Sequence, residues 1–289
     1  TIVNIIYNQM SRFKLNLIKK YFNQTNRLNI RNHKYRSQLK TLTEFFLQED
    51  LDKTGDKTSQ LLIKNNTKTK AIILSKQRGV VAGIEEITWL LRNHKLKFIP
   101  KIRDGKKVKN KQEIGVVEGR KKDILKIERT VLNILQRMSG IATQTNKLVK
   151  EANKVLICST RKTQWGLLDK RAVVCGGGGT HRLGLYDFVL IKENHLKNGK
   201  LPINSKKLKS IFWEIEVENI KQALQMAKLS PSVIMFDNFK PDKIKQVIKQ
   251  IKKINPNIIF EASGGISEEN IVKYNSAGTM EFLLDSISG

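Results

Sequence analysis

The 289-residue chain has little cysteine, little acidic charge and no long apolar run. Its two cysteines, Cys158 and Cys175, lie beside apolar runs and cannot form a disulfide framework. We therefore expect a reducing compartment, the cytoplasm. No apolar run reaches the roughly 20 residues that cross a bilayer, so we expect no membrane span. The hydrophobic content of 39% is compatible with a globular protein that has a substantial core.

The shortage of acidic residues leaves a net charge of +28, from 54 Lys and Arg against 26 Asp and Glu. A strong basic excess can indicate nucleic-acid or membrane binding. Here, however, the lysines are spread along the chain. Over residues 240–253 they alternate with isoleucine and valine, as in an amphipathic helix with a solvated basic face. We therefore expect nucleic acid not to be a main partner.

Three regions follow one another along the sequence, with expected boundaries near residues 40 and 153. Residues 1–40 are basic, and no acidic residue precedes Glu44. Such a segment is typical of an organellar targeting peptide. The alternative, which we favour, is a basic terminal arm or a first helix.

Residues 41–153 mix strand and helix patterns. Apolar runs predict strands near residues 70–75, 79–83, 98–102 and 114–117. A long helix follows, because apolar residues recur every three or four positions from Ile124 to Ala142. Arg129 lies on this helix away from the apolar stripe, so it is either solvated or reaches towards a ligand.

Residues 154–289 alternate short apolar runs with helical patterns. Runs near 155–160, 188–192, 211–217, 233–236 and 258–260 predict strands, and 282–284 predicts another. Helices are expected over 220–229, 241–254 and 268–274. Strands that alternate with helices indicate parallel βαβ units and a barrel-like domain.

Charged residues follow several of these strands. Arg161, Lys162, Arg182 and Lys192 each lie at or near a strand end, so four cations are expected to converge on one mouth. Such a mouth suits a small ligand with several negative charges. In a β/α barrel the site is built at the carboxyl ends of the strands.

Acidic residues end the later strands. Glu216 and Asp237 would face the same mouth and could hold Mg²⁺ through oxygen ligands. The alternative, that Glu214, Glu216 and Glu218 form one polar face of a strand, is weak because an unpaired buried carboxylate is costly. Ser263-Gly264-Gly265 could present backbone N–H groups to a phosphate, although such a turn alone is a weak signal.

Two further features have competing interpretations. The glycine run 176–179 is by default a flexible loop. A lone histidine is more often structural than catalytic. Because His181 is followed by Arg182 and lies among the other cations, we instead expect it to contact a ligand.

With these motifs the chain resembles the quinolinate phosphoribosyltransferase family, from about Glu49 to about Gly278. Many motifs occur in the family's order, which makes chance similarity very improbable. The motifs on which the resemblance depends are Glu49-Asp-Leu with Gly55-Asp56, Glu128-Arg-Thr with residues 139–143, Thr160-Arg-Lys-Thr163, residues 176–182, residues 190–195, Glu214-Ile-Glu-Val217, Phe236-Asp-Asn238 and Glu261-Ala-Ser-Gly-Gly-Ile266.

The resemblance implies a fold, an activity and an assembly. The fold is an N-terminal open α/β sandwich followed by an incomplete α/β barrel. The activity is transfer of phosphoribosyl from phosphoribosyl pyrophosphate to quinolinate with decarboxylation, which needs Mg²⁺ and gives nicotinate mononucleotide, CO₂ and pyrophosphate. The active unit is a homodimer or a larger homo-oligomer with sites at the subunit interface.

The resemblance also implies residue roles. The pyridine dicarboxylate is held by the cations and by Arg129, which comes from the partner subunit. Lys162 lies near both substrates, Glu216 and Asp237 lie at the ribose and metal, and the loop 263–265 holds the 5′-phosphate. The implied substrate-binding residues are Arg129, Thr160, Arg161, Lys162, His181, Arg182, Lys192, Ser263, Gly264 and Gly265, and the implied catalytic residues are Lys162, Glu216 and Asp237.

The chain departs from the family pattern in three places. Ser159 stands where the family often has Asp, and Gln164-Trp165-Gly166 replaces a more usual Thr-Pro-Gly. Ser286 stands where a glycine of a second phosphate loop is expected.

The sequence is compatible with three functions. The first is the decarboxylating enzyme. The second is a relative for another ring acid, such as nicotinate or the substrate of the homologue found with molybdate transport. The third is a non-catalytic basic protein that binds nucleic acid. The full set of cations favours a dicarboxylate, and Glu216 and Asp237 argue against the third.

Overall fold

The computed structural model describes residues 12–152, 155–197, 201, 205–275 and 282–287. The chain forms two compact units, in which distant segments are combined. Unit 1 consists of residues 1–24, 147–162 and 178–289, and unit 2 consists of residues 25–146 and 163–177. The boundaries expected near residues 40 and 153 follow the order of the sequence and do not anticipate this exchange of segments. As domain boundaries they stay a prediction.

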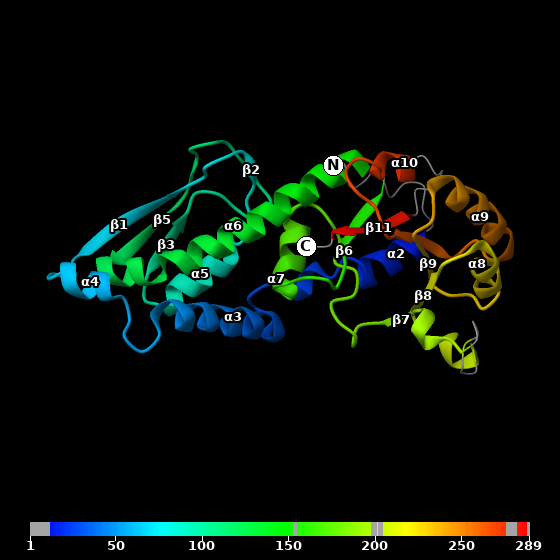
Figure 1. Ribbon diagram of the computed structural model, residues 1–289, viewed down its shortest axis with the longest axis horizontal. Helices are drawn as coiled ribbons and strands as arrows, with labels where there is room; N and C mark the ends of the chain where they lie inside the picture. The colour runs from blue at the N-terminus through cyan, green and yellow to red at the C-terminus, as the bar shows by residue number, and fades with distance from the viewer. Residues whose placement is uncertain (1–11, 153–154, 198–200, 202–204, 276–281, 288–289) are drawn as a thin grey trace. The chain divides into compact units, whose positions relative to one another are not determined.

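Unit 2 contains a three-stranded antiparallel sheet in the order β1-β5-β3 (Figure 1). A pair of very short strands, β2 and β4, lies apart from it. The strands are β1 (Lys68–Leu74), β2 (Gly79–Val80), β3 (Lys97–Pro100), β4 (Lys107–Val108) and β5 (Glu113–Arg120). The helical elements are the 3-10 turn η1 (Thr25–Arg27), α3 (His33–Leu51), α4 (Lys57–Leu62), α5 (Ile84–Asn93), α7 (Leu167–Cys175) and most of α6 (Lys121–Ala152).

The long helix α6 forms as its apolar stripe predicts. The whole stripe from Ile124 to Ala142 is buried, whereas Arg129 on another face is exposed. The last turns of α6, from Lys147, belong to unit 1. A stripe that repeats at 3.6 residues is therefore enough to fix both the helix and the face that it buries.

Unit 1 contains a six-stranded sheet in the order β6-β11-β10-β9-β8-β7, and every neighbouring pair is parallel (Figure 1). Its strands are β6 (Leu156–Ser159), β7 (Val189–Ile191), β8 (Trp213–Val217), β9 (Val233–Asp237), β10 (Ile259–Ser263) and β11 (Phe282–Ile287). Its helical elements are α2 (Arg12–Tyr21), α8 (Ile220–Ala227), α9 (Pro241–Ile254), α10 (Ile271–Asn275) and the 3-10 turns η2 (Glu193–His195) and η3 (Ser205–Leu208).

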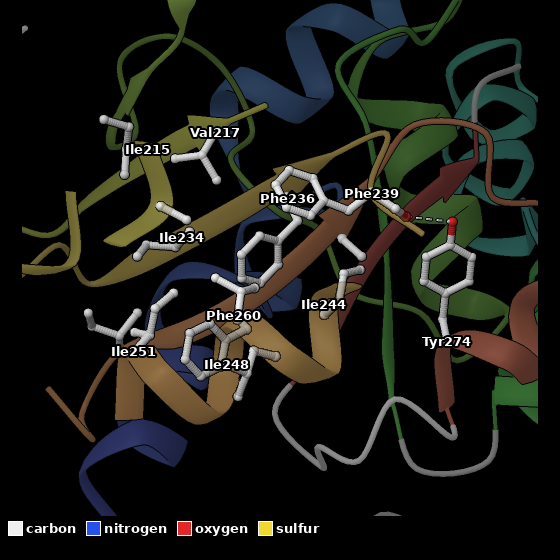
Figure 2. Packing of buried hydrophobic residues seen from close by; sticks show 14 of the residues in the cluster. Ile215, Val217, Ile234, Phe236, Phe239, Ile244, Ile248, Ile251, Phe260 and Tyr274 are labelled. Carbon is white, nitrogen blue, oxygen red and sulfur yellow. Dashed lines mark hydrogen bonds between the residues drawn. The ribbon is translucent and has the colours of Figure 1, made fainter. Parts of the chain in front are cut away.

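One face of this sheet is entirely apolar where the helices cover it. Ile215, Ile234 and Phe260 alternate along their strands and pack with the buried side of α9, as Figure 2 shows. The predicted helix 241–254 is confirmed: its apolar residues Ile244, Val247, Ile248 and Ile251 are buried, and its lysines alternate with them. Tyr274 closes the cluster by donating from its hydroxyl to the carbonyl of Phe239 at 3.2 Å.

The opposite face of the sheet carries the polar residues of the strands. Because side chains alternate along a strand, Glu214 and Glu216 lie on the face away from Ile215, and Glu261 and Ser263 on the face away from Phe260. Towards the amino ends of the strands this face is apolar. There Val233 and Ile259 pack with an aromatic cluster formed by Phe22, Phe188 and Phe212.

The basic N-terminal segment contributes to this inner face. Ile18 and Phe22, in and just after α2, are buried in the aromatic cluster, and Phe22 has no exposed surface. Residues 1–11 lie outside the described part of the chain. Residues 12–24 of the basic segment therefore belong to unit 1 and contribute to its core, whereas residues 25–40 belong to unit 2.

Two expected elements differ in extent from the observed ones. The strand expected from residue 211 begins at Trp213, and the helix expected over 268–274 is α10, from Ile271. In the second case a turn intervenes, because the side chain of Asn270 accepts the Ser267 amide at 2.8 Å and donates to the Gly265 carbonyl. Among the described residues, no helix is both long and apolar enough to cross a membrane.

Candidate active site

The carboxyl ends of neighbouring strands in unit 1 collect the predicted acidic and phosphate-binding residues. Asp237 and Ser263 end β9 and β10 and are directly paired across the sheet. Glu216 lies near the end of β8, and Lys192 follows β7. Parallel pairing therefore brings together four predicted site residues that are up to 71 positions apart in the sequence.

Acidic side chains gather at this edge. Glu193, Asp237 and Glu216 all raise the pKa of the exposed carboxyl of Glu218, with Glu193 the largest contributor. Lys192 donates from Nζ to the carboxylate of Glu216 and so compensates part of this negative charge. The side-chain amide of Asn238 donates to the carboxylate of Asp237 at 2.9 Å. The remaining repulsion is what a divalent cation with oxygen ligands would relieve.

The turn after β10 brings bare backbone to the same edge. The backbone N–H of Asn238 donates to the Ser263 carbonyl at 2.8 Å, and this hydrogen bond fixes the turn against β9. Gly264 has φ +84°, and an added Cβ would lie 2.2 Å from the side-chain oxygen of Asn238. Gly265 also has a positive φ, but open space surrounds the position of its missing Cβ. The turn thus has room for a ligand beside Gly265 and none beside Gly264.

Two of the predicted cations are close enough to affect each other. Arg161, exposed just after β6, lowers the pKa of Arg182, although burial of Arg182 lowers it more. Glu214 and Asp187 act in the opposite direction. Lys162 is also exposed, and its amide donates to the hydroxyl of Thr160 at 2.9 Å. Arg161 and Arg182 therefore form a concentrated positive site in unit 1.

The glycine run brings Arg182 into this site and is closely packed. Gly179 forms a parallel bridge with Cys158 of β6 and donates to the Ile157 carbonyl at 2.7 Å. A Cβ on Gly179 would lie 2.8 Å from the Cys158 sulfur. The default expectation of a flexible loop is therefore wrong for this position, because only glycine fits so close to the strand.

His181 is buried and turned towards protein groups. Its Nε2 lies 3.2 Å from Glu214 and 3.3 Å from Glu261, and both glutamate side chains have no exposed surface. Its Nδ1 lies 2.8 Å from the amide nitrogen of Arg182. Burial lowers the pKa of His181, but the two carboxylates outweigh this and raise it to about 10.

Sequence reasoning did not identify Glu214 and Glu261 as partners of His181. Both occur within motifs of the family pattern, but no role follows from the motif. The available signal was that Glu214 is a carboxylate in the middle of a strand buried on both faces, which needs a partner. The partner could not be identified because it lies 33 positions away, beyond the glycine run.

Arg129 belongs to unit 2, unlike the other predicted site residues. It is exposed on α6 and lines a hollow of about 490 Å³. The opposite wall is the loop that carries the Gly55-Asp56 motif. There Asp56 accepts the Ser59 amide at 3.0 Å and caps α4, and this hydrogen bond with Ser59 lowers the pKa of Asp56. The hollow contains both charge signs beside Arg129.

The departures from the family pattern have partners of their own. In unit 2 Trp165 packs on Phe46, with ring centroids 5.2 Å apart, and under the guanidinium of Arg137 at 4.9 Å. Arg137 also donates to Gln164 and to Asp169, each at 2.8 Å. In unit 1 the hydroxyl of Ser159 donates to the Thr180 carbonyl at 3.3 Å. Gln164-Trp165 therefore fits its surroundings as it stands.

The altered C-terminal position falls in β11. The pairing of this strand with β6 shifts register between Asp285 and Ile287, and Ser286 lies at this shift. The side chains of β11 and residues 288–289 lie outside what the structure describes.

Two family models together match most of the chain. The model described as the N-terminal domain of quinolinate phosphoribosyl transferase matches residues 56–139, and the C-terminal domain model matches residues 141–286. Among solved structures, the nicotinate-nucleotide pyrophosphorylase from Francisella tularensis aligns with a TM-score of 0.78 and 31% identity. The alignment covers 86% of this chain and 90% of that one. The fold is therefore an N-terminal α/β sandwich with a C-terminal incomplete barrel.

Curated relatives agree with the family models. A probable nicotinate-nucleotide pyrophosphorylase (carboxylating) from Bacillus subtilis is 36% identical over 267 residues, or 86% of this chain and 90% of that protein. A quinolinate phosphoribosyltransferase (decarboxylating) from Nicotiana glauca, named as mitochondrial, is 35% identical over 83% of this chain and 76% of its own length. The chain belongs to the quinolinate phosphoribosyl transferase family.

Proposed function

We propose that this chain transfers the phosphoribosyl group from phosphoribosyl pyrophosphate to quinolinate, with decarboxylation. The products are nicotinate mononucleotide, CO₂ and pyrophosphate. Family membership supports this reaction. The observation that carries it is the meeting of Glu216, Asp237 and the 263–265 turn at one edge of a parallel sheet. That edge suits a substrate with a sugar, phosphates and a metal.

The dicarboxylate would be held by the cations. Arg161 and Arg182 lie close enough for one to lower the pKa of the other, so a doubly charged acid would relieve their repulsion. Lys192 would exchange its contact with Glu216 for a substrate carboxylate. His181 would support Arg182 at this carboxylate, because both of its ring nitrogens face protein groups. Thr160 and Lys162 would line the entrance to the site.

Phosphoribosyl pyrophosphate would lie over the carboxyl ends of β8 to β10. The turn 263–265 would hold the 5′-phosphate with its backbone N–H groups. Glu216 and Asp237 would hold Mg²⁺, because the donor set is all oxygen and the acids at this edge repel one another. When bound, Mg²⁺ neutralises charge on the departing pyrophosphate.

The two chemical steps use these residues differently. In the first, the pyridine nitrogen forms a bond to the anomeric carbon while the bond to pyrophosphate breaks. Glu216 and Asp237 face the positive charge that develops on the sugar, and Lys162 would contact both substrates. In the second, the 2-carboxylate leaves as CO₂. Its electron pair stays on the ring carbon next to the positive nitrogen until that carbon takes a proton from water.

We also propose a homodimer or larger homo-oligomer as the active unit. Arg129 is exposed on α6 in unit 2, as an arginine that reaches a neighbour's site must be. A cytoplasmic location stays a prediction from the sequence.

The two other candidate functions have weaker support. Human nicotinic acid phosphoribosyltransferase aligns with a TM-score of 0.56 at 9% identity, which indicates the fold alone. A non-catalytic basic protein would have no need of the acids Glu216 and Asp237, which meet at one edge of the sheet. The lysines of α9 are those of a solvated helix face, because the apolar residues of this helix are buried in the core.

The deciding experiment compares two acids as acceptors. Purified protein is supplied with phosphoribosyl pyrophosphate, Mg²⁺ and either quinolinate or nicotinate, and nicotinate mononucleotide is measured. We expect product from quinolinate only, because a monoacid would leave a buried cation unpaired, at a cost of about 2–5 kcal/mol. Equal turnover of both acids would contradict the proposal. As a control for loss of positive charge away from the site, the exposed lysines Lys245, Lys249 and Lys252 are replaced by glutamine. This variant should keep its activity with quinolinate.

A further inference from the structure

The ring of His181 joins two strands to the backbone that carries Arg182. Its Nε2 lies between Glu214 of β8 and Glu261 of β10, at 3.2 and 3.3 Å. Its Nδ1 lies 2.8 Å from the Arg182 amide nitrogen. One imidazole therefore connects two buried carboxylates with the residue that presents a cation to the site.

The position of the ring proton follows from these contacts. A ring protonated on both nitrogens would have no lone pair for the Arg182 amide, so the 2.8 Å contact and the raised pKa of His181 compete. Whether the ring is neutral or charged, Nε2 carries a proton, because the two carboxylates face Nε2 and not Nδ1. The carboxylates thus fix the direction of the ring.

The surroundings of the ring leave it one orientation. Phe22 meets it edge to face at 5.1 Å between centroids, and Phe188 packs on it at 5.3 Å. His181 also has φ +47°, a backbone conformation that residues other than glycine seldom adopt. Such a conformation persists only where the surroundings determine it. Anchoring of the ring therefore also anchors the turn between His181 and Arg182.

Stability alone does not explain two buried carboxylates around one histidine. Neither oxygen of Glu214 accepts a hydrogen bond of regular geometry from any residue that the structure describes. Burying a carboxylate with so few donors is costly, and apolar residues of similar size would pack here without that cost. Such arrangements are concentrated at functional sites.

The two glutamates lie directly beneath the proposed substrate. Glu214 is two residues before Glu216 on β8, and Glu261 is two residues before Ser263 on β10. Each pair shares a face of the sheet. The buried negative charge of Glu214 also counteracts the effect of Arg161 on Arg182. It thereby helps two guanidinium groups to share one site.

We propose that Glu214 and Glu261 are positioning residues for the anionic half of the site. They hold the His181 ring and, through it, place Arg182 to bind a carboxylate of the acid substrate. This inference rests on the proposed function for its kinetic test, and it adds two residues that do not themselves touch the substrate.

The kinetic test uses the neutral variants Glu214→Gln and Glu261→Gln, which keep the side-chain shape. We expect the KM for quinolinate to rise about tenfold in each, the size of a coupling between contacting residues. The KM for phosphoribosyl pyrophosphate should change less than about twofold. The melting temperature should fall by less than the loss of a whole buried pair would cause, because the other carboxylate still faces His181. A lowered melting temperature with both KM values unchanged would overturn the proposal in favour of a purely structural role.

Coupling to Arg182 is tested by a double-mutant cycle. Arg182→Lys keeps the charge but alters the geometry, so it should raise the KM for quinolinate by itself. Adding Glu214→Gln to it should raise that KM by clearly less than the same change does in the wild type. Fully multiplicative effects would mean that the glutamates do not act through Arg182, and the proposal would fail.

Glu86→Gln is the matched control, because Glu86 is an equally buried glutamate in unit 2. It should leave both KM values unchanged. Metal content of the purified wild type is measured in parallel, since His181, Glu214 and Glu261 together could also hold a metal ion. One firmly bound transition metal per chain, lost in both glutamine variants, would overturn the positioning role.

A spectroscopic readout separates this inference from the proposed function. The chain has four histidines, so the ring-nitrogen NMR signals of His181 can be assigned by comparison with His181→Asn. We expect Glu214→Gln and Glu261→Gln to shift the His181 signals and Glu86→Gln to leave them in place. If the wild type makes no product from quinolinate, the proposed function fails, and this comparison still decides the positioning role. Unshifted signals in both variants would overturn it.

Discussion

At the scale of single residues, the two glycines of the phosphate turn are not equivalent. Both have a positive φ, which costs a residue with a side chain about 1–2 kcal/mol. Only at Gly264 would a Cβ also collide with Asn238, at 2.2 Å from its oxygen. The sequence presents the pair as a single Ser-Gly-Gly signal. The difference arises from the neighbouring strand, which the local sequence does not reveal.

We therefore predict that Gly264→Ala is clearly more damaging than Gly265→Ala. Strain alone should cost Gly265→Ala about 1–2 kcal/mol. Gly264→Ala adds an overpacking cost of about 1–3 kcal/mol and displaces Asn238, so its KM for phosphoribosyl pyrophosphate should rise more. Urea unfolding and steady-state kinetics of both variants measure this. Equal effects of the two substitutions would show that the contact with Asn238 is unimportant.

A second residue-scale prediction concerns Glu86 in unit 2. Burial, followed by repulsion from Asp104, raises its pKa to about 7, although the hydrogen bond from Tyr35 and the charge of Arg171 oppose the shift. Between its unfolded pKa, near 4.5, and 7, the folded state binds the extra proton. Stability contributed by this group is therefore present at low pH and is lost as the pH rises towards 7.

Glu86→Gln should remove this dependence. The loss across that interval is on the order of 3 kcal/mol, so the variant should be more stable than the wild type at pH 8 and about equal at pH 4.5. Chemical unfolding of both proteins at several pH values between 4.5 and 8 is the measurement. Parallel stability curves for the two proteins would mean that Glu86 does not titrate in this range.

At the scale of elements, the periodic patterns predicted which segments form and which face they bury. The stripe of α6 and the alternation in β8 to β10 follow from local sequence. The contacts between faces do not. His181 meets Glu214 and Glu261 because three separate segments converge, and alternation indicates a face without indicating what it contacts. For the same reason the sequence predicts the basic segment only as an arm or a first helix, and does not predict that residues 12–24 pack against the inner face of the sheet.

We predict that the packing of Phe22 against the inner face of the sheet is essential to the stability of unit 1. Phe22 has no exposed surface and contacts Phe188 and Phe212, so Phe22→Ala should destabilise the fold by about 3–5 kcal/mol. Phe13, on α2 itself, is 59% exposed, and Phe13→Ala should cost less than about 0.5 kcal/mol. The free energies of unfolding in urea compare the two. A similar loss in both variants would indicate that α2 does not pack as described.

At the scale of the whole molecule, the chain is divided between two units in a way that no local pattern announces. Residues 25–146 separate two parts of unit 1, and residues 163–177 return to unit 2 between Lys162 and Gly178. The Thr160-Arg-Lys-Thr163 motif thus lies at a crossing between units. One predicted site residue, Arg129, belongs to unit 2, whereas the others belong to unit 1. If Arg129 has its predicted role, residues of both units take part in the reaction, from one chain or from two.

Activity in mixed dimers decides whether Arg129 acts in its own chain or in a neighbour. If Arg129 acts in a neighbouring subunit, Arg129→Ala and Lys192→Ala damage the same site from different chains, and each homo-oligomer is inactive. In a mixed dimer one site then carries both changes and the other carries neither. Random exchange at equal amounts makes half of the dimers mixed, so about a quarter of wild-type activity should return. Subunit exchange is verified with chains that carry different affinity tags. Confirmed exchange without recovered activity would show that Arg129 acts within its own chain or has no part in the reaction. A matched mixture of Arg161→Ala with Lys192→Ala, both in unit 1, should stay inactive, because every site in it then carries at least one change.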